Sequence, residues 1–229
     1  MTKIAIMGYG VVGSGLIELI DKNRENHRRN EIVITSILVR DKDKYIDSSH
    51  IDVITTSVEE FFSAESDVVI EVMGGINPAY DYVKNALSLK KHVVTANKDL
   101  IATFGHELFQ LAKKNKVSLK FEAAVAGGIP IIKPLTESLY GNGISSIKAI
   151  LNGTTNFILT KMDRESLSYE EALKEAQELG FAEANPESDV KGYDSARKLA
   201  ILSSLAFNKK FQWNDISIEG ITAVSYTHL

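Results

Sequence analysis

Apolar residues near the start of the chain form a short run that a series of glycines interrupts. The run covers residues 3–7 and leads into Gly8, Gly10 and Gly13. A segment with helical spacing of apolar residues follows at 16–20. Short apolar runs are typical of buried strands, whereas apolar positions three and four apart indicate a helix. The pattern therefore predicts a strand, a glycine turn and a helix in direct succession.

The alternation of strand-like and helix-like segments continues as far as residue 121. Apolar or β-branched runs alternate with segments whose apolar positions share one helical face. Strands are expected at 32–39, 67–73, 92–96 and 117–121, and helices at 57–62, 78–89 and 104–114. Regular alternation of this kind is typical of a doubly wound parallel sheet covered by helices. The fold class expected for this part of the chain is therefore α/β.

The character of the sequence changes at residues 123–130, which are small, apolar and rich in glycine. Such a stretch is typical of a hinge, so we expect a first domain at 1–126 and a second at 127–222. Elements expected in the second domain are a helix near Pro130, a strand at 144–151, a turn into a helix at 152–156, and a helix at 169–179 between Ser168 and Gly180.

Composition and charge narrow the classes of protein that fit this pattern. The 229 residues carry a formal net charge of −4 and contain no cysteine. This charge gives no general attraction to nucleic acid or to an anionic membrane. The absence of cysteine excludes disulfides, thiolate metal sites and a thiol nucleophile. Glycines interrupt the first apolar run and no signal-peptide cleavage pattern follows it, so we expect a soluble, cytoplasmic protein without a membrane span.

The three glycines after the first predicted strand have the spacing of a dinucleotide-binding turn. In such a turn Gly8 permits the tight bend, Gly10 lets the backbone approach a pyrophosphate, and Gly13 lets helix and strand pack closely. The N–H groups at the start of the helix then point at the phosphates. An ordinary glycine loop between two buried elements is the alternative. The position of the motif, directly after the first strand, favours the dinucleotide site.

The end of the second predicted strand bears on the choice of cofactor. An acidic residue there binds the ribose hydroxyls of NAD, whereas an arginine accommodates the 2′-phosphate of NADP. The strand ends at Arg40, which favours NADP, and Asp41 follows directly and leaves NAD open. A charged turn without a role in binding is the alternative for both residues.

Two lysines are candidates for the chemistry. Lys98 follows a predicted strand, and ligands of parallel sheets bind at the carboxyl ends of the strands. A solvated loop lysine is the alternative there. Lys198 shares a predicted helical face with Asp194 and with aliphatic residues. This pair is either an ordinary exposed helix pair or a lysine partly removed from water that gives or takes a proton.

Taken together, the motifs resemble those of homoserine dehydrogenase. They occur in the order of that family and cover nearly all of residues 1–222. The matching stretches are 8–13, 95–98, 122–130, 151–157 and 179–183, followed by Asp189, Gly192, Asp194 and Lys198. The resemblance implies a Rossmann-type doubly wound parallel sheet followed by an incomplete α+β substrate domain. It also implies hydride exchange between NAD(P) and the C4 alcohol of L-homoserine to give L-aspartate 4-semialdehyde, in the biosynthesis of threonine, methionine and isoleucine.

The resemblance further implies roles for individual residues. Lys198 would be the proton donor or acceptor at the C4 oxygen, with Lys98 between nicotinamide and substrate and Asp194 supporting the site. Residues expected to bind the cofactor are Gly8, Gly10, Val11, Val12, Gly13, Arg40, Gly74 and Lys98. Residues expected to bind the substrate are Glu183, Asp189, Asp194 and Thr154. An ammonium can protonate the alkoxide that forms when hydride adds to an aldehyde, and a carboxylate can pair with an amino group.

Members of this family also bind a monovalent cation such as sodium. By the resemblance its ligands would be the carboxylate of Glu122 and the carbonyls of Val125, Gly127 and Ile129. Hard cations do prefer oxygen ligands. The family also implies a homodimer of the full chain and a small-molecule substrate, with no nucleic-acid or membrane partner. Family members continue further, and residues 223–229 do not resemble them, so we expect a truncated chain with a foreign tail.

Other classes of protein share the predicted glycine turn. A semialdehyde dehydrogenase forms a thiohemiacetal on a cysteine, and this chain has none. A dinucleotide-sensing regulator needs a basic DNA-reading element, and the sequence shows none. Two alternatives stay open: a noncatalytic remnant that still binds the cofactor, and a redox-sensing regulator.

Overall fold

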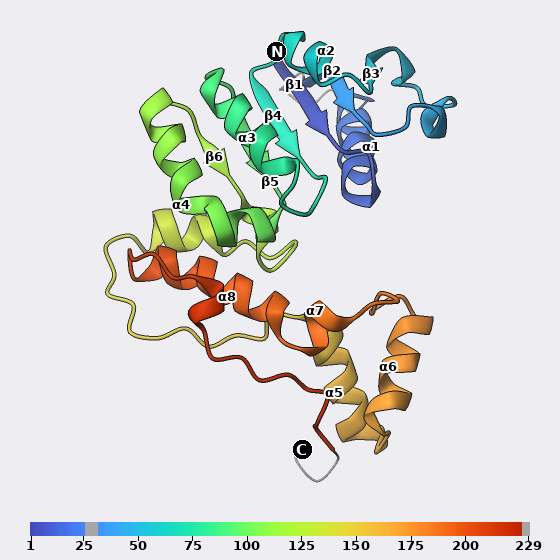
Figure 1. The fold of residues 1–229 in the computed structure, drawn as a ribbon, viewed down its shortest axis with the longest axis vertical. Helices are drawn as coiled ribbons and strands as arrows, with labels where there is room; N and C mark the ends of the chain where they lie inside the picture. Colours follow the sequence, from blue (N-terminus) through green and yellow to red (C-terminus); the bar gives the residue numbers. More distant parts are fainter. Residues whose placement is uncertain (26–31, 226–229) are drawn as a thin grey trace. The chain divides into compact units, whose positions relative to one another are not determined.

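The computed structural model describes residues 1–25 and 32–225. The chain divides into two compact units, Met1–Gly128 and Ile129–Leu229 (Figure 1). Residues 226–229, at the end of the expected tail, lie outside the described residues. In the part of the chain that the structure describes, no helix has both the length and the apolar character that crossing a bilayer requires.

A six-stranded parallel sheet forms the centre of the first unit. Its strands are β1 Thr2–Met7, β2 Ile32–Leu38, β3 Ile54–Thr55, β4 Val68–Glu71, β5 His92–Thr95 and β6 Leu119–Lys120. They lie in the order β3-β2-β1-β4-β5-β6, and each neighbouring pair is parallel. The short strand β3 was not predicted from the sequence. The sheet confirms the predicted α/β, doubly wound fold class.

Helices connect the strands of this sheet. They are α1 Val11–Glu25, α2 Val58–Ser63, α3 Ala79–Ser88 and α4 Lys98–Asn115, with short 3-10 turns at Asp43–Tyr45, Ile51–Val53 and Glu122–Ala124. The helices α3 and α4 lie side by side (Figure 1), and Lys84 of α3 pairs with Glu107 of α4 at 2.9 Å. The predicted succession of strands and helices is thereby confirmed in this unit.

The strand β1 is buried because it lies between β2 and β4 and is covered by side chains of α1. Ala5, Ile6 and Met7 are 0% exposed. A strand that is covered on both faces needs a nearly continuous apolar run, as this sequence has. Ile6 belongs to the same core cluster as Ile17 and Ile20 of α1. This packing holds α1 against the strand that precedes it.

The order of the strands changes direction at β1. The chain adds β2 and β3 on one side of β1 and then returns to add β4, β5 and β6 on the other side. Ligands of open parallel sheets bind outside the carboxyl ends of the strands at such a point. The residues that follow β1 and β4 therefore lie where a ligand is expected.

The turn after β1 leaves no room for side chains at two of its glycines. Gly8 has a φ of +105°, and a Cβ there would lie 2.9 Å from the carbonyl oxygen of Val72. A Cβ at Gly13 would lie 2.4 Å from the carbonyl oxygen of Gly8. At Gly10 the Cβ position is open, because no non-neighbouring atom of the described residues lies within 4 Å. The bend predicted at Gly8 and the close packing predicted at Gly13 are both confirmed.

The helix predicted at 104–114 exists, but it starts earlier than the apolar pattern indicated. Helix α4 begins at Lys98, because the side chain of Asn97 accepts a hydrogen bond from the Leu100 N–H at 3.1 Å. Asparagine is a favoured residue at this capping position. Lys98 is therefore the first residue of a helix and not part of a loop.

Helices form the second unit. They are a π-helical turn at Pro134–Ser138, α5 Gly153–Glu165, α6 Tyr169–Glu178, α7 Glu187–Val190 and α8 Tyr193–Ala206, with a 3-10 turn at Trp213–Asp215. Ile158 and Met162 of α5 pack with Ala172 and Ala176 of α6 in one buried cluster. The helices predicted after 152–156 and at 169–179 are confirmed.

Local capping explains the bounds of α6. The Ser168 side chain accepts a hydrogen bond from the Glu171 N–H, and the Glu171 side chain accepts one from the Ser168 N–H. This reciprocal arrangement satisfies two N–H groups at the start of the helix. Gly180 follows the helix with a φ of +79°, which favours glycine. Both signals were readable in the sequence.

The strand predicted at 144–151 is wrong. These residues have no regular secondary structure, and no strand occurs in the described part of the second unit. Ile147, Lys148, Ala149 and Leu151 line one cavity, so even the alternation of faces that a strand would give is incomplete here. Alternation reports only which side chains share a face, whereas a strand also needs a neighbour that completes its hydrogen bonds. In the described residues of this unit, the regular elements are therefore helices.

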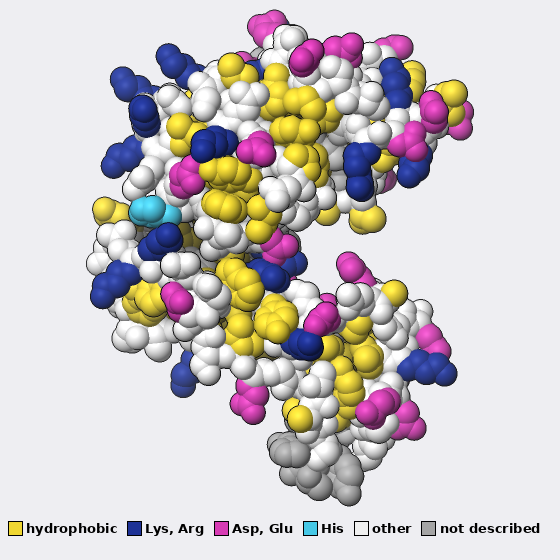
Figure 2. All heavy atoms as spheres, in the orientation of Figure 1, with side chains coloured by type: hydrophobic (Ala, Val, Ile, Leu, Met, Phe, Trp, Pro, Cys, Tyr) yellow, Lys and Arg dark blue, Asp and Glu magenta, His cyan; other side chains and the backbone are white. Residues whose placement is uncertain are grey.

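On the face of the molecule that Figure 2 shows, basic side chains gather along the upper left edge, and acidic and basic side chains are interspersed over the rest. The formal net charge of the chain is −4.

Gly13→Ala is expected to destabilise the first unit, because its Cβ would meet the Gly8 carbonyl oxygen. Overpacking of this kind costs about 1–3 kcal/mol. Gly15→Ala is the matched control in the same helix, since its added Cβ meets no atom of the described residues within 4 Å. This control should stabilise the helix by about 0.5–1 kcal/mol. Urea unfolding measures both free energies, and equal effects of the two substitutions would contradict the close packing.

Candidate active site

The first turn of α1 offers hydrogen-bond donors directly after the glycine turn. The first intrahelical bond runs from the Ser14 N–H to the Gly10 carbonyl at 2.8 Å. The N–H groups of Val11, Val12 and Gly13 precede it and have no partner within the helix. The side chains of Val11 and Val12 are also 91% and 56% exposed. Together with the open surface at Gly10, these donors at the positive end of a helix fit a pyrophosphate.

The glycine turn is held against the segment that follows β2. The rings of Tyr9 and Tyr45 stack with centroids 4.7 Å apart and planes inclined by 7°. The Tyr45 hydroxyl donates to the Tyr9 carbonyl at 3.0 Å. Arg40 and Asp41 lie between β2 and Tyr45 and are exposed. Arg40 therefore sits on a segment that adjoins the predicted phosphate site.

Gly74 lies on the loop after β4, and Lys98 begins the helix that follows the short loop after β5. Gly74 is exposed and has a φ of +75°. The Nδ2 of Asn97 donates to the Gly75 carbonyl at 2.5 Å and so joins the two loops. Gly74 and Lys98, both predicted to bind the cofactor, thus lie at neighbouring positions on the carboxyl edge of the sheet.

In the second unit, Lys198 and Asp194 form a largely buried ion pair. The Lys198 Nζ lies 2.7 Å from the Asp194 Oδ2, and the two side chains are 17% and 3% exposed. The same Nζ donates to the Leu151 carbonyl at 2.8 Å. An ammonium has three N–H groups, so the third has no partner among the described residues. The alternative of an exposed helix pair is thereby excluded.

Asn152 joins this ion pair to a second carboxylate. Its Nδ2 donates to the Asp189 Oδ1 at 2.7 Å and to the Asp194 Oδ2 at 2.9 Å. Its Oδ1 accepts from the Thr155 N–H at 2.8 Å and caps α5. Asn152 is 5% exposed. A single side chain thus starts a helix and sets the spacing of two carboxylates.

Thr154 holds the loop that carries Glu183. Thr154 is buried, and its hydroxyl donates a hydrogen bond to the Phe181 carbonyl at 2.6 Å. The Phe181 ring stacks on Phe157 of α5 with centroids 4.5 Å apart. Glu183 is exposed, and no hydrogen bond or ion pair joins its carboxylate to Lys198 or Asp194 in the described residues. The structure thus brings Lys198, Asp194 and Asp189 together, but not Glu183.

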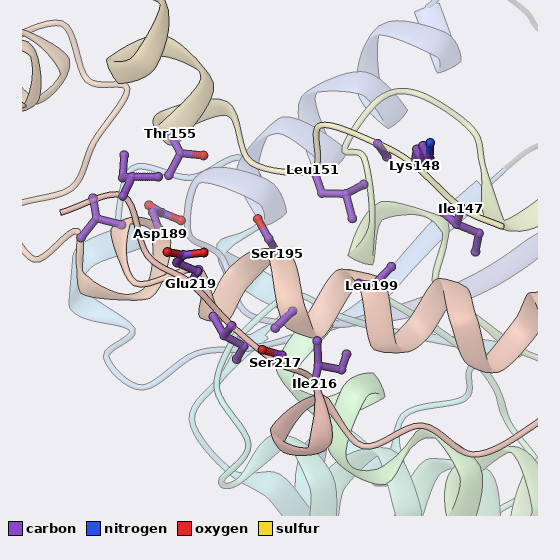
Figure 3. A pocket seen from close by; sticks show the side chains of 16 residues that line it. Ile147, Lys148, Leu151, Thr155, Asp189, Ser195, Leu199, Ile216, Ser217 and Glu219 are labelled. Atoms are coloured by element: carbon purple, nitrogen blue, oxygen red, sulfur yellow. The ribbon is translucent and has the colours of Figure 1, made fainter. Parts of the chain in front are cut away.

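A cavity of about 480 Å³ lies beside this network in the second unit. The face of α8 that carries Ser195 and Leu199 forms one wall of the cavity (Figure 3). The segments 147–151 and 216–221 contribute the other walls. Asp189 lines the cavity, whereas Lys198 and Asp194 do not. Asp189 is therefore the carboxylate of the network that a ligand in the cavity can reach.

The predicted cation ligands stand on both sides of the boundary between the units in the sequence. Glu122, Val125 and Gly127 belong to the first unit, and Ile129 begins the second. Ala126 and Gly127 have φ values of +60° and +55°, so the backbone turns sharply between these carbonyls. No group of three or more His, Cys, Asp or Glu side chains in the described residues could hold a metal ion. The predicted ligand set has one carboxylate, that of Glu122, and three carbonyl oxygens.

Family models match both units of the chain. The model described as "Homoserine dehydrogenase, NAD binding domain" matches residues 8–122, and the model described as "Homoserine dehydrogenase" matches residues 130–229. The chain belongs to the homoserine dehydrogenase family. The resemblance stated from the motifs is confirmed, and the glycine turn lies within the NAD-binding domain of the family.

Individual homoserine dehydrogenases match along nearly the whole chain. The enzyme of Bacillus subtilis (strain 168) is 45% identical over 97% of this chain and 53% of its own length. The crystal structure of the Thiobacillus denitrificans enzyme is 40% identical, with a TM-score of 0.91 over 99% of this chain and 53% of that one. A hyperthermophilic archaeal homoserine dehydrogenase in complex with NADPH is 30% identical, with a TM-score of 0.82. This chain spans about half the length of the curated relatives it matches.

Two buried residues, Asn152 of the Lys198 network and Glu71 of the first unit, were not predicted to belong to the site. Asn152 was assigned only to a turn, although asparagine before a helix is a capping signal. Glu71 was assigned only to a strand, and it is 0% exposed at the end of β4. A carboxylate within an apolar strand run is unusual and needs buried partners. The charged Glu71 within an apolar run was therefore the feature of the sequence that could have indicated this residue.

Asn152→Ser is expected to weaken the second unit, because serine keeps the helix cap but removes both amide donors to the carboxylates. Leaving a buried carboxylate short of a donor costs about 1–3 kcal/mol. Asn152→Ala should cost about 1 kcal/mol more, since the cap is also lost. Ser168→Ala, which removes only the cap of α6, is the control. Chemical unfolding gives the values, and an Asn152→Ser protein as stable as the wild type would refute the bridging role.

Proposed function

We propose that this chain is an NAD(P)-dependent oxidoreductase that interconverts L-homoserine and L-aspartate 4-semialdehyde. The observation that carries the proposal is the buried Lys198 ammonium, which keeps one N–H beyond its bonds to Asp194 and Leu151. It occurs in a chain of the homoserine dehydrogenase family, whose first unit matches the NAD-binding domain. Such a reaction would serve the biosynthesis of threonine, methionine and isoleucine.

The first unit would bind the cofactor through backbone donors. The N–H groups of Val11, Val12 and Gly13 would contact the pyrophosphate, which approaches over the open surface of Gly10. Arg40 would pair with a 2′-phosphate, so NADP is the proposed cofactor. The archaeal relative with bound NADPH supports this choice. When bound, the nicotinamide exchanges the hydride with the C4 carbon of the substrate. Lys98 would lie between the nicotinamide and the substrate.

Lys198 would move the proton. When hydride adds to the aldehyde, negative charge develops on the C4 oxygen, and the third N–H of Lys198 would protonate it. In the direction of homoserine oxidation, the neutral amine would take that proton back. Asp194, at 2.7 Å, favours the ammonium that then forms. The Leu151 carbonyl, at 2.8 Å, fixes where the nitrogen lies.

The carboxylates around this lysine would recognise the amino group of the substrate. Glu183 is exposed and has no partner in the network of the described residues, so it is available for an ammonium ligand. Asp189 is reachable from the cavity and is oriented by Asn152. The Thr154 hydroxyl donates to Phe181 and would therefore act on the substrate only as an acceptor.

Further properties of the family extend the proposal. A monovalent cation, sodium by the family's example, would bind the Glu122 carboxylate and the carbonyls of Val125, Gly127 and Ile129. The turn at Ala126 and Gly127 supports such a carbonyl site. The full-length protein would be a cytoplasmic homodimer.

The proposal is tested with homoserine and NADP, by following the absorbance of the reduced nicotinamide at about 340 nm. Lys198→Met should lower turnover by about 10²–10⁴-fold, because the proton donor is lost. Lys198→Arg keeps a cation beside Asp194 but does not release its proton at neutral pH, so it should also be inactive while folding normally. Lys174→Met removes a surface lysine that pairs with Glu178 at 3.8 Å, and should keep full turnover.

NADPH fluorescence measures cofactor binding by each variant, and all three should bind like the wild type. Full turnover by Lys198→Arg and Lys198→Met would overturn the role of the lysine. A wild-type protein that binds NADPH but does not oxidise homoserine would support the noncatalytic remnant instead.

A further inference from the structure

The carboxylate of Glu71 lies entirely out of water at the point where a ligand of the sheet is expected. Glu71 is the last residue of β4, which pairs with β1 on one side and β5 on the other. It is 0% exposed. A buried carboxylate is costly unless hydrogen bonds satisfy its oxygens. Its partners therefore show what the residue does.

Glu71 accepts hydrogen bonds from both loops at this edge of the sheet. Its Oε1 accepts from the N–H groups of Met73 at 2.9 Å and Gly74 at 3.3 Å, on the loop after β4. Its Oε2 accepts from the Thr95 hydroxyl at 2.5 Å, at the end of β5. The Nδ2 of Asn97 lies 3.5 Å from Oε1.

These contacts continue into the start of α4. The Thr95 hydroxyl accepts from the Asn97 N–H at 2.9 Å. Asn97 donates to the Gly75 carbonyl and caps α4, whose first residue is Lys98. Glu71 is thus the common acceptor that fixes the loop of Gly74 and the helix end of Lys98 with respect to each other.

We propose that Glu71 is a positioning residue for the cofactor, which sets the Gly74 loop and Lys98 through its bonds to both loops. The proposal rests on the proposed function and deepens its cofactor site. The N–H groups of Met73 and Gly74 donate to Glu71 and are not available to a ligand. The surface that this loop presents to a bound cofactor therefore consists of backbone carbonyl oxygens and the Cα of Gly74. Such a surface suits the donor groups of a nicotinamide riboside better than a phosphate.

The chemistry of the partners requires a carboxylate at this position. Each of its partners donates, and an ionised carboxylate is the side-chain group that only accepts. Glu71→Gln keeps the volume but places an NH₂ group in the site. Turned toward Thr95, that group can donate to the hydroxyl oxygen, but the Thr95 O–H then loses the oxygen that accepts from it. Turned the other way, the NH₂ group faces the Met73 and Gly74 N–H groups, and both of these hydrogen bonds are lost. Each orientation therefore loses at least one hydrogen bond that the carboxylate makes.

The test measures NADPH affinity of the whole chain by fluorescence titration, without homoserine. Glu71→Gln should weaken NADPH binding about tenfold at a temperature where circular dichroism shows a folded protein. Thr95→Val removes the hydroxyl while leaving the carboxylate, and should have a similar effect. The double variant should bind no more weakly than the singles, because both substitutions break one network. Thr95→Ser keeps the hydroxyl and should restore wild-type affinity.

Amide hydrogen exchange gives a second readout. The Gly74 N–H should exchange at least tenfold faster in Glu71→Gln than in the wild type, while exchange in α1 stays unchanged. Unchanged NADPH affinity in Glu71→Gln and Thr95→Val, with only a lowered melting temperature, would overturn the positioning role. A wild-type protein that binds NADPH but does not oxidise homoserine would overturn the proposed reaction. The NADPH affinities of the Glu71 and Thr95 variants would still test whether Glu71 positions the cofactor site.

Discussion

Each unit of the molecule contains one buried carboxylate whose oxygens need hydrogen-bond donors: Glu71 in the first unit and Asp194 in the second. In both cases an asparagine caps a helix with its side-chain oxygen and approaches the carboxylate with its nitrogen: Asn97 at 3.5 Å from Glu71, and Asn152 at 2.9 Å from Asp194. Removing a carboxylate from water costs several kcal/mol unless such partners are in place. The start of the helix and the orientation of the carboxylate are therefore fixed together, next to Lys98 in one unit and to Lys198 in the other.

This constraint explains why the candidate catalytic groups are held firmly. Lys198 is tied by Asp194 and by the Leu151 carbonyl, which directly precedes the capping Asn152. The lysine, the carboxylates and the helix N-terminus therefore belong to one hydrogen-bonded network. Groups that must meet a substrate in a defined geometry benefit from this, because less ordering is needed when the substrate binds. Glu183, on an exposed loop, lies outside this network.

Much of the fold could be predicted from apolar spacing and capping residues. The sheet of the first unit and the helices after Asn152 and Ser168 follow from those signals, because burial and capping are local demands on a sequence. The strand expected at 144–151 failed because pairing depends on a neighbouring segment that alternation does not report. Lys198 and Asp194 were found from their helical spacing, but Glu71 and Asn152 were missed, since a hydrogen bond between residues distant in sequence leaves no periodic signal.

We propose that the chain moves a hydride between the C4 carbon of homoserine and a nicotinamide, and that Lys198 transfers the proton. The most direct measurement uses homoserine deuterated at C4 together with NADP, and determines the mass of the reduced cofactor that is formed. We expect reduced cofactor that is heavier by one deuterium, formed about 10²–10⁴-fold more slowly when Lys198 is replaced by methionine. Reduced cofactor without deuterium, or no reduced cofactor from a wild-type protein that binds NADP, would contradict it.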